Sequence, residues 1–548
     1  MKIHLLMPLA LFLSVPACLV SKEKADLVVT NGVIYTVNES FDVAEAMAIR
    51  NGRILATGST ADMLGRYKAA EIRDLEGAFV YPGWIDAHCH FFGYGMNLNA
   101  ADLTGTTSVE EILDRLAAHR ERYPDSPWIT GRGWDQNDWE EKNFPSRADL
   151  DALFPDTPVL LRRIDGHAAW VNSRALELAG IHAGLRVEGG SIVLDHGEPT
   201  GILIDNAIGL AARMVPGPET GEIVRALKEA EQNCFRVGLT SVQDAGLPKD
   251  VVEWIDSLHR TGELTIRIDA WLEPSRDNID RFVLRGPYRT DRLSVNTIKL
   301  FADGALGSRG ARMLEDYSDD PGNRGLFVTS PEELERLCRL AFENRFAVAT
   351  HCIGDEANRL MLGIYGDILG GKNDRRWRIE HAQVVHPGDF DLFGRYSILP
   401  SVQPTHATSD MDWAEDRLGP QRIKGAYAYR QLLDQNGWLP AGSDFPVEDI
   451  NPLFGFYAAV VRKDKEGNPA GGFQTGNALT REEALRAMTI WAARAAFEED
   501  LKGSLEAGKL ADFVVTATDL MTAPEKDLHA IPVESTYSGG VEVYRRMP

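Results

Sequence analysis

The sequence predicts an α/β fold built around buried strands that each end in a side chain able to hold a metal. Short apolar runs recur along the chain, several stop at a His, Lys or Asp, and helical patterns separate several pairs of runs. With 13 His in 548 residues, four at equivalent strand ends are hard to obtain by accident. The runs and the residues that follow them are 80–87 with His88 and His90, 295–298 with Lys299, 346–350 with His351, 377–380 with His381, and 439–443 with Asp444.

His88 and His90 follow the first of these runs. In a strand, residues i and i+2 point to the same side, so both imidazoles would face one space and Cys89 the opposite one. Two neutral imidazoles at bonding distance suit a borderline-soft divalent metal such as zinc. A His-x-His is weak evidence alone, and the later strand-end ligands are what turn it into a predicted metal site.

Longer motifs around these runs resemble the amidohydrolase superfamily, and above all its N-substituted formamide deformylase-like branch. They cover nearly the whole chain after its first residues: PGWIDAHCHFFGYG, GRGWDQNDW, DGHAAWVNSRAL, GLTSVQDAG, IKLFADGALGSRGA, ATHCIGDEAN, RIEHAQ, SVQPTHATSDMDWA and AGSDFPVEDINP. The resemblance implies a (β/α)8 TIM-type barrel with one or two metals. Its strands are expected at 80–88, 239–245, 265–271, 296–302, 346–351, 377–381, 398–403 and 440–444.

The resemblance also implies the metal ligands, at the C-terminal ends of the strands where such barrels carry their active sites. His88 and His90 would hold one metal, His351 and His381 the second, and Lys299 would bridge them, with Zn²⁺ as the expected ion. A lysine ammonium has no lone pair, so bridging requires carboxylation of Lys299 by carbon dioxide. The alternative is a buried lysine paired with one of two nearby acids, Asp303 or Asp444.

Asp444 is expected to be a metal ligand and the general base. A bound cation lowers the pKa of water toward neutrality, and a carboxylate at the end of the eighth strand can pass the water proton to a leaving nitrogen. The alternative is that Asp444 is an ion-pair partner only.

Five further residues are weaker candidates for contact with substrate. Asp303 and Arg309 bound a loop that could shape a pocket or bind a carboxylate through the guanidinium, and a plain loop is the alternative. His167 and His406 could contact substrate or be structural. Trp134 could line an apolar pocket or pack an inserted region.

Around the barrel, 83–499, two further parts are predicted. Residues 25–82 and 500–548 contain short apolar runs, and the first has Asn-Gly hairpin signals. The resemblance implies that the two combine into one small β-sandwich, and neither part has enough strands to close a core alone, which independently favours their pairing. The gap from 88 to 239 far exceeds one βα unit, which predicts an insertion at 125–205 beside the active site.

Residues 1–18 resemble a targeting segment. Lys2 precedes an apolar stretch, 5–15, that is too short to span a bilayer. Ala17 before Cys18 resembles a bacterial lipoprotein processing site, although the two residues before Ala17 depart from the usual pattern. Export to the periplasm is expected, with a lipid anchor through Cys18 or ordinary cleavage after Ala17 as the two forms.

Composition limits the function further. Lys and Arg total 58 against 81 Asp and Glu, a net charge of −23, which argues against nucleic acid because its binding needs clustered basic residues. The four Cys beyond Cys18 have no disulfide-framework spacing and are expected as buried free thiols, with Cys89 as a metal ligand the alternative.

Together these features predict an exported, metal-dependent hydrolase that cleaves a C–N bond, an amide or an N-acyl or N-formyl group, of a small molecule. Ester or lactone hydrolysis and deamination are the alternatives on the same barrel. A non-catalytic binding or regulatory protein would be signalled by missing ligands, and none is missing. The sequence is compatible with a homodimer and leaves the substrate open, because specificity on this fold resides in variable loops.

Overall fold

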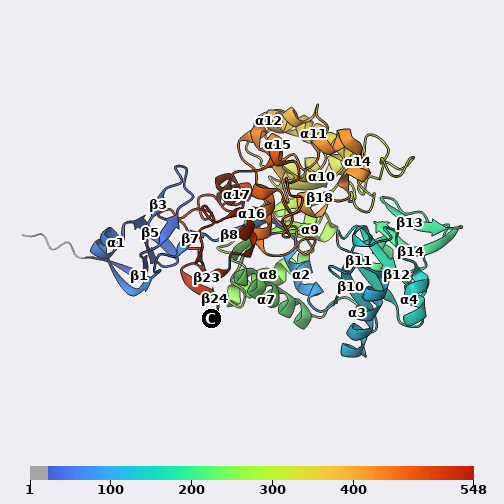
Figure 1. Cartoon of the computed structure of the whole chain (residues 1–548), viewed down its shortest axis with the longest axis horizontal. Coiled ribbons are helices and arrows are strands. Elements are labelled where there is room, and N and C mark those ends of the chain that lie inside the picture. The colour runs from blue at the N-terminus through green and yellow to red at the C-terminus, as the bar shows by residue number, and fades with distance from the viewer. Residues whose placement is uncertain (1–21, 548) are drawn as a thin grey trace, which may run out of the picture.

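A computed structural model describes residues 22–547. Its centre is a sheet of parallel strands in the order β21-β20-β19-β18-β16-β15-β8, with the short antiparallel β17 (Tyr288–Arg289) beside β18 (Figure 1). The parallel strands are β8 (Trp84–Cys89), β15 (Leu239–Leu247), β16 (Arg267–Leu272), β18 (Leu293–Phe301), β19 (Ala347–Cys352), β20 (Arg378–His381) and β21 (Leu399–Ser401). Seven of the eight expected barrel strands are therefore present.

The eighth expected strand, 440–444, is not a regular strand, so this part of the prediction was wrong. The segment nevertheless occupies the eighth position, because Ala441 forms a parallel bridge with Val402 and the Asp444 N–H donates to the His88 carbonyl at 2.7 Å. It begins with a proline, which has no N–H for a strand ladder, and ends at Asp444 with a φ of 64°. The ring of strands is thus closed by a few backbone hydrogen bonds on each side, which join Ala441 and Asp444 to β8 and Pro440 and Gly442 to Val402 after β21.

Helices cover the outside of the barrel. In α10 (Pro331–Glu343), Ser330 caps the first turn and the buried residues Leu334, Leu337, Cys338 and Ala341 follow helical spacing. Thr480 and Glu483 form a capping box at the start of α17 (Arg481–Ala487), which is followed by α18 (Ile490–Ala495). Other helices of the barrel are α2 (Phe91–Asn97), α7 (Thr220–Arg236), α8 (Lys249–Thr261), α11 (Asp355–Leu369), α12 (Phe390–Tyr396), α14 (Ala414–Arg422), α15 (Tyr429–Asn436) and α16 (Pro452–Val461).

A separate mixed sheet follows β8 and α2 in the chain. Its order is β13-β14-β12-β11-β10-β9, and it lies at one end of the elongated molecule (Figure 1). It starts at residue 101, earlier than the 125 expected for the insertion. The strands are β9 (Ala101–Asp102), β10 (Ile129–Trp134), β11 (Val159–Arg163), β12 (Ala168–Val171), β13 (Gly190–Asp195) and β14 (Glu198–Asp205), with α3 (Val109–Arg122), α4 (Arg147–Leu153), α5 (Ser173–Ala179) and α6 (Ile208–Ala212) packed around them.

The N-terminal segment lies at the opposite end of the molecule, and the C-terminal segment lies between it and the barrel (Figure 1). One sheet has the order β5-β4-β1-β6 and the other β24-β23-β22-β7-β2-β3, and an apolar cluster with members from both sheets, including Leu27, Ile34 and Phe513, lies between them. These strands are β1 (Glu23–Thr30), β2 (Val33–Tyr35), β3 (Val43–Ala44), β4 (Ala46–Arg50), β5 (Arg53–Gly58), β6 (Tyr67–Asp74), β7 (Phe79–Pro82), β22 (Phe513–Thr516), β23 (Val533–Ser538) and β24 (Val541–Arg545). The predicted fold class, a barrel with a composite β-sandwich and an insertion, is confirmed.

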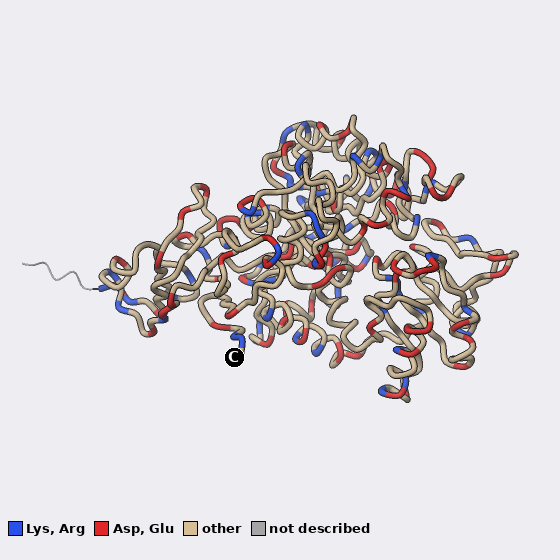
Figure 2. The backbone as a smooth tube through the Cα atoms, viewed as in Figure 1, with Lys and Arg blue, Asp and Glu red and all other residues tan. Residues whose placement is uncertain are grey.

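The remaining features are the N-terminal segment, the cysteines and the distribution of charge. The predicted targeting segment, 1–18 with Cys18, lies outside the described residues. Across 22–547, no helix is both long and apolar enough to cross a membrane. Cys89, Cys234, Cys338 and Cys352 are buried free thiols, as expected. Acidic and basic residues are interspersed over all parts of the molecule (Figure 2).

Candidate metal centre

Predicted ligands meet at the C-terminal ends of the barrel strands. His88, His381 and Asp444 are buried, and one ligand atom from each lies within 4.8 Å of the others. Two of the three ligands have left-handed backbone: His381, at the end of β20, has a φ of 71°, and Asp444 has a φ of 64°. Left-handed backbone at two non-glycine ligands is uncommon and occurs here at the site itself.

These three side chains fit a divalent cation. His381 Nδ1 and Asp444 Oδ1 are buried and form no hydrogen bond within the described chain. Buried polar atoms are normally satisfied, so these two lone-pair atoms are available to a cation, with His90 Nε2 as a further neighbour of Asp444 Oδ1 at 3.2 Å. Two imidazoles and a carboxylate are a donor set that zinc accepts, with room left for a water molecule or a substrate.

His90 and His351, the other two predicted histidine ligands, border this group. His90 directly precedes α2. Its Nε2 lies 3.2 Å from Asp444 Oδ1, and its Nδ1 donates to the Ala245 carbonyl at 3.0 Å. The His351 ring centroid is 4.6 Å from that of His381, but its Nε2 lies 3.3 Å from the Gly304 carbonyl. The structure therefore brings His90 onto the ligand group and leaves His351 beside it.

The side chain of Lys299, on β18, extends to the ligand group formed by His88, His381 and Asp444. Its Nζ lies 3.0 Å from His88 Nε2 and 4.8 Å from the centroid of the Phe301 ring. Burial lowers its pKa to about 8, against the opposing charges of Glu380 and Asp444. Among residues 22–547 it forms no salt bridge with Asp303 or Asp444, and its polar contact at the site is with His88.

Glu380 orients His88 and was not singled out from the sequence. Its Oε2 accepts a hydrogen bond from His88 Nδ1 at 2.5 Å, and its Oε1 lies 3.3 Å from Arg378 Nε, with all three side chains buried. Burial opposes ionisation of Glu380, but the charge of Arg378 and the hydrogen bond from His88 hold its pKa below its usual value. Burial, together with the charge of Lys299, lowers the pKa of His88 to about 4. A neutral His88 with its Nδ1–H fixed on a carboxylate presents the Nε2 lone pair to the site.

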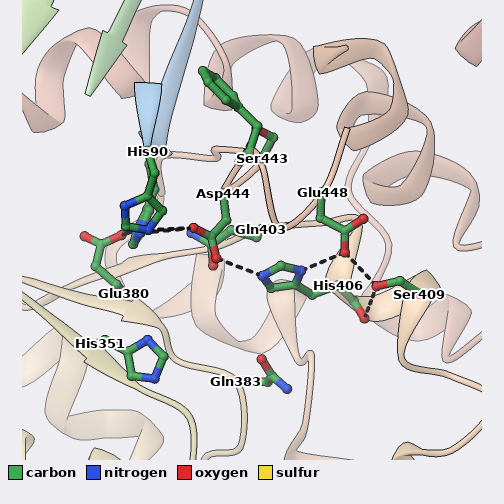
Figure 3. A network of polar contacts seen from close by, with 12 residues as sticks. His90, His351, Glu380, Gln383, Gln403, His406, Ser409, Ser443, Asp444 and Glu448 are labelled. Carbon is green, nitrogen blue, oxygen red and sulfur yellow. Dashed lines mark hydrogen bonds and ion pairs between the residues drawn. The ribbon is translucent and has the colours of Figure 1, made fainter. Parts of the chain in front are cut away.

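A second chain of polar contacts runs from buried Asp444 through His406 to the half-buried Glu448 and the exposed Ser409 (Figure 3). His406 Nε2 lies 3.4 Å from Asp444 Oδ2, and its Nδ1 donates to Glu448 Oε1 at 2.9 Å. Ser409 Oγ donates to the same Glu448 oxygen at 2.7 Å. Burial alone would lower the pKa of His406, but the two carboxylates raise it to about 10. Burial would raise the pKa of Asp444, but His406, His88 and His90 hold it well below its usual range.

Two weaker candidates lie beside the centre. His167 Nδ1 donates to Asp205 at 2.6 Å, and the His167 ring centroid is 4.7 Å from that of His351. Asp303 is fully buried, and its two oxygens accept backbone N–H groups of Ile353, Gly354 and Arg312 at 2.8–3.0 Å. Those bonds fix the loops after β18 and β19, so Asp303 has a structural role.

Two other candidates are committed to protein contacts. Trp134 is fully buried in the core of the insertion, and its Nε1 donates to the Leu161 carbonyl at 2.9 Å, so it packs the insertion and does not line a pocket. The Arg309 guanidinium forms an ion pair with Asp319 at 2.8 Å, so the group that could have bound a substrate carboxylate is paired within the chain.

Fold and site together define a hydrolase of the metal-dependent barrel class. The chain belongs to the amidohydrolase family, whose model matches residues 71–544. It is 37% identical to Protein LONG AFTER FAR-RED 3 of Arabidopsis thaliana over 95% of this chain and 92% of that protein. It is 27% identical to the N-substituted formamide deformylase of Arthrobacter pascens over 95% and 98%. A solved structure described as an uncharacterized metal-dependent hydrolase from Pyrococcus horikoshii superposes with a TM-score of 0.74 at 29% identity, over 91% of this chain and 99% of that one.

Proposed function

We propose that this hydrolase cleaves a C–N bond, in an amide or an N-acyl or N-formyl group of a small molecule. The observation that carries the proposal is the convergence of His88, His381 and Asp444 within 4.8 Å, with two of their buried atoms unpartnered. Similarity along 95% of the chain to a protein named as a formamide deformylase supports the choice of bond.

Zn²⁺ is the metal we propose, in one or two copies, with His90, His351 and Lys299 as further ligands. When bound, the cation supplies Lewis acidity toward water and toward a carbonyl oxygen. Only a neutral amine attacks carbon dioxide, and the lowered pKa of Lys299 raises the neutral fraction near pH 8. Its Nζ would then bond to the carbon of carbon dioxide and release one proton, which gives the side chain two ligand oxygens.

Asp444 is the proposed proton carrier. Its carboxylate is held ionised by His406 and lies against His88 and His90, so it can accept a proton from the attacking water and deliver it to the leaving nitrogen. His406 and Glu448 position that carboxylate, because the buried His406 ring contacts Oδ2 and is itself held by the half-buried Glu448.

The test combines metal analysis with a substrate screen. Protein purified without chelator should contain about one or two equivalents of metal per chain, and chelation should abolish activity reversibly. The screen compares N-formyl and N-acyl amides with matched esters, lactones and aminopurines. Faster turnover of the esters or release of ammonia from the aminopurines would replace amide hydrolysis, and full activity without metal would reject the site.

Export is a further proposal and rests on residues 1–18 alone. Mass spectrometry of the mature N-terminus separates lipidation at Cys18 from cleavage after Ala17. Light scattering of the purified chain tests the homodimer.

A further inference from the structure

Two arginines of the insertion have no carboxylate partner within residues 22–547. Arg132 lies on β10 and Arg162 on the adjacent parallel strand β11, where they are register partners, so both side chains extend from one face of the sheet. Both are partly buried. In the described chain, the two side chains form one hydrogen bond, from Arg132 Nη2 to the Ile164 carbonyl at 2.7 Å, and Arg132 Nε is buried without a partner.

The next residue along β11 shows what a paired arginine looks like in this sheet. Arg163 is fully buried, pairs with both Asp135 and Asp165, and donates its Nε–H to Gln136 at 2.8 Å. The insertion therefore gives two carboxylates to Arg163 and none to its two neighbours. A guanidinium stays charged in proteins, and a partly buried cation without an anion is costly to fold.

Arg132 lies near the candidate metal centre, and Arg162 is its register partner on the next strand. The Arg132 guanidinium lies so close to Gly166 that a Cβ there would be 3.4 Å from Nη1. The residue after Gly166 is His167, whose ring is 4.7 Å from that of His351. Burial lowers the pKa of Arg132 to about 10, and the charge of Asp444 is one of the groups that oppose this effect.

We propose that Arg132 and Arg162 bind an oxyanion of the substrate, a carboxylate or a phosphate, while the scissile bond lies at the metal centre. This inference rests on the proposed hydrolase function and narrows its substrate to an amide with an anionic group at its other end. Paired guanidinium groups bind such anions through several parallel, charge-assisted hydrogen bonds. The contact also satisfies two cations that the chain itself leaves unpaired.

The test uses the metal-loaded full chain and a series of N-formyl ω-amino acids of increasing length. Each acid is compared with its uncharged ω-amide, and 2-formamidoethyl phosphate is included to separate carboxylate from phosphate. The variants are Arg132→Met and Arg162→Met, which keep most of the apolar stem. Arg174→Met, in α5 of the same insertion and paired with Glu177 on the surface, is the matched control.

Wild type should prefer the charged member of the pair at one chain length or in the phosphate. At that optimum, either Met variant should raise KM about 10–100-fold, the usual scale for a hydrogen bond to a charged group. The uncharged amides and the control should change by less than about twofold. Because an unpaired cation is removed, both Met variants should unfold at or above the wild-type temperature.

Equal use of charged and uncharged amides at every length, or equal losses on both in the Met variants, would overturn the inference. If no amide is cleaved, the proposed function fails and calorimetric titration of the same compounds decides the arginine pair separately. Tighter binding of the charged compounds by wild type than by the Met variants supports the pair, and equal binding removes it.

Discussion

Replacing Glu380 by Gln should weaken metal binding although Glu380 is not a predicted ligand. Glu380 holds His88 Nδ1 at 2.5 Å, and both side chains are fully buried, so no water can replace the lost carboxylate. Partners of this kind typically contribute about 10–100-fold to metal affinity, or about 1.4–2.7 kcal/mol. Gln keeps the size of the side chain but loses the charge that favours an Nδ1–H imidazole. We therefore expect the Kd for Zn²⁺ to rise by that factor.

Competition with a chromophoric chelator measures this Kd without reference to turnover. Glu231→Gln is the control, because it also removes a buried carboxylate, one that accepts hydrogen bonds from Thr265 Oγ1 and the Ile266 N–H at the N-terminal end of β16. Circular dichroism verifies that both variants are folded, since Gln at position 380 also weakens the contact with Arg378. An unchanged Kd in folded Glu380→Gln, or an equal loss in the control, would refute the reasoning.

Three further predictions follow from the site and its surroundings. Asp444→Asn should lower kcat by about 10²–10⁴-fold with KM much less affected; stopped assays on samples of measured metal content check this, and near-normal turnover would exclude Asp444 as the proton carrier. Lys299→Ala should lose metal, as elemental analysis would show, and bicarbonate with a short carboxylic acid should restore part of the activity; a high-resolution map with a free ammonium beside bound metal would reject the bridge. Arg430 donates to Glu483 at 2.7 Å and is the main reason that the pKa of Glu483 falls from 4.5 to about 2. Because that pKa is depressed in the folded state, the pair should stabilise the protein by about 1 kcal/mol above pH 5 and lose this contribution between about pH 5 and 2, so denaturant melts of Arg430→Met and wild type should converge in acid.

The strand ends that carry the site could be predicted because each buried strand is short, apolar and followed by a polar residue. The rule works for Lys299 and His351, which lie within regular strands. It fails at Asp444, since proline at one end and a left-handed residue at the other leave the eighth segment without a ladder. The Pro and Gly residues within 439–443 already indicated that this segment would not form a regular strand.

The partners of the ligands could not be predicted with the same ease. Glu380 directly precedes His381, so in the sequence it stands out only as part of the run that leads to that ligand. Its contact with His88 joins residues 292 apart in the sequence. Likewise, nothing in the sequence shows that Arg163 has two acids and Arg132 none, because that depends on which face of the insertion sheet each side chain leaves. Pairing across strands is a property of the folded chain.

The antiparallel pairing of β7 with β22 has a consequence for how the protein is made. A ribosome synthesises β7 more than four hundred residues before β22, so its edge stays open until the C-terminal strands emerge. Only Gly83 separates β7 from β8, whose end carries His88. A chain truncated before residue 513 would therefore leave an apolar strand edge unprotected next to the barrel, where strands of other chains can add. Synthesis of the barrel alone therefore does not protect this edge from aggregation. The edge of β7 is protected only when the full-length chain is released and β22 can pair with it.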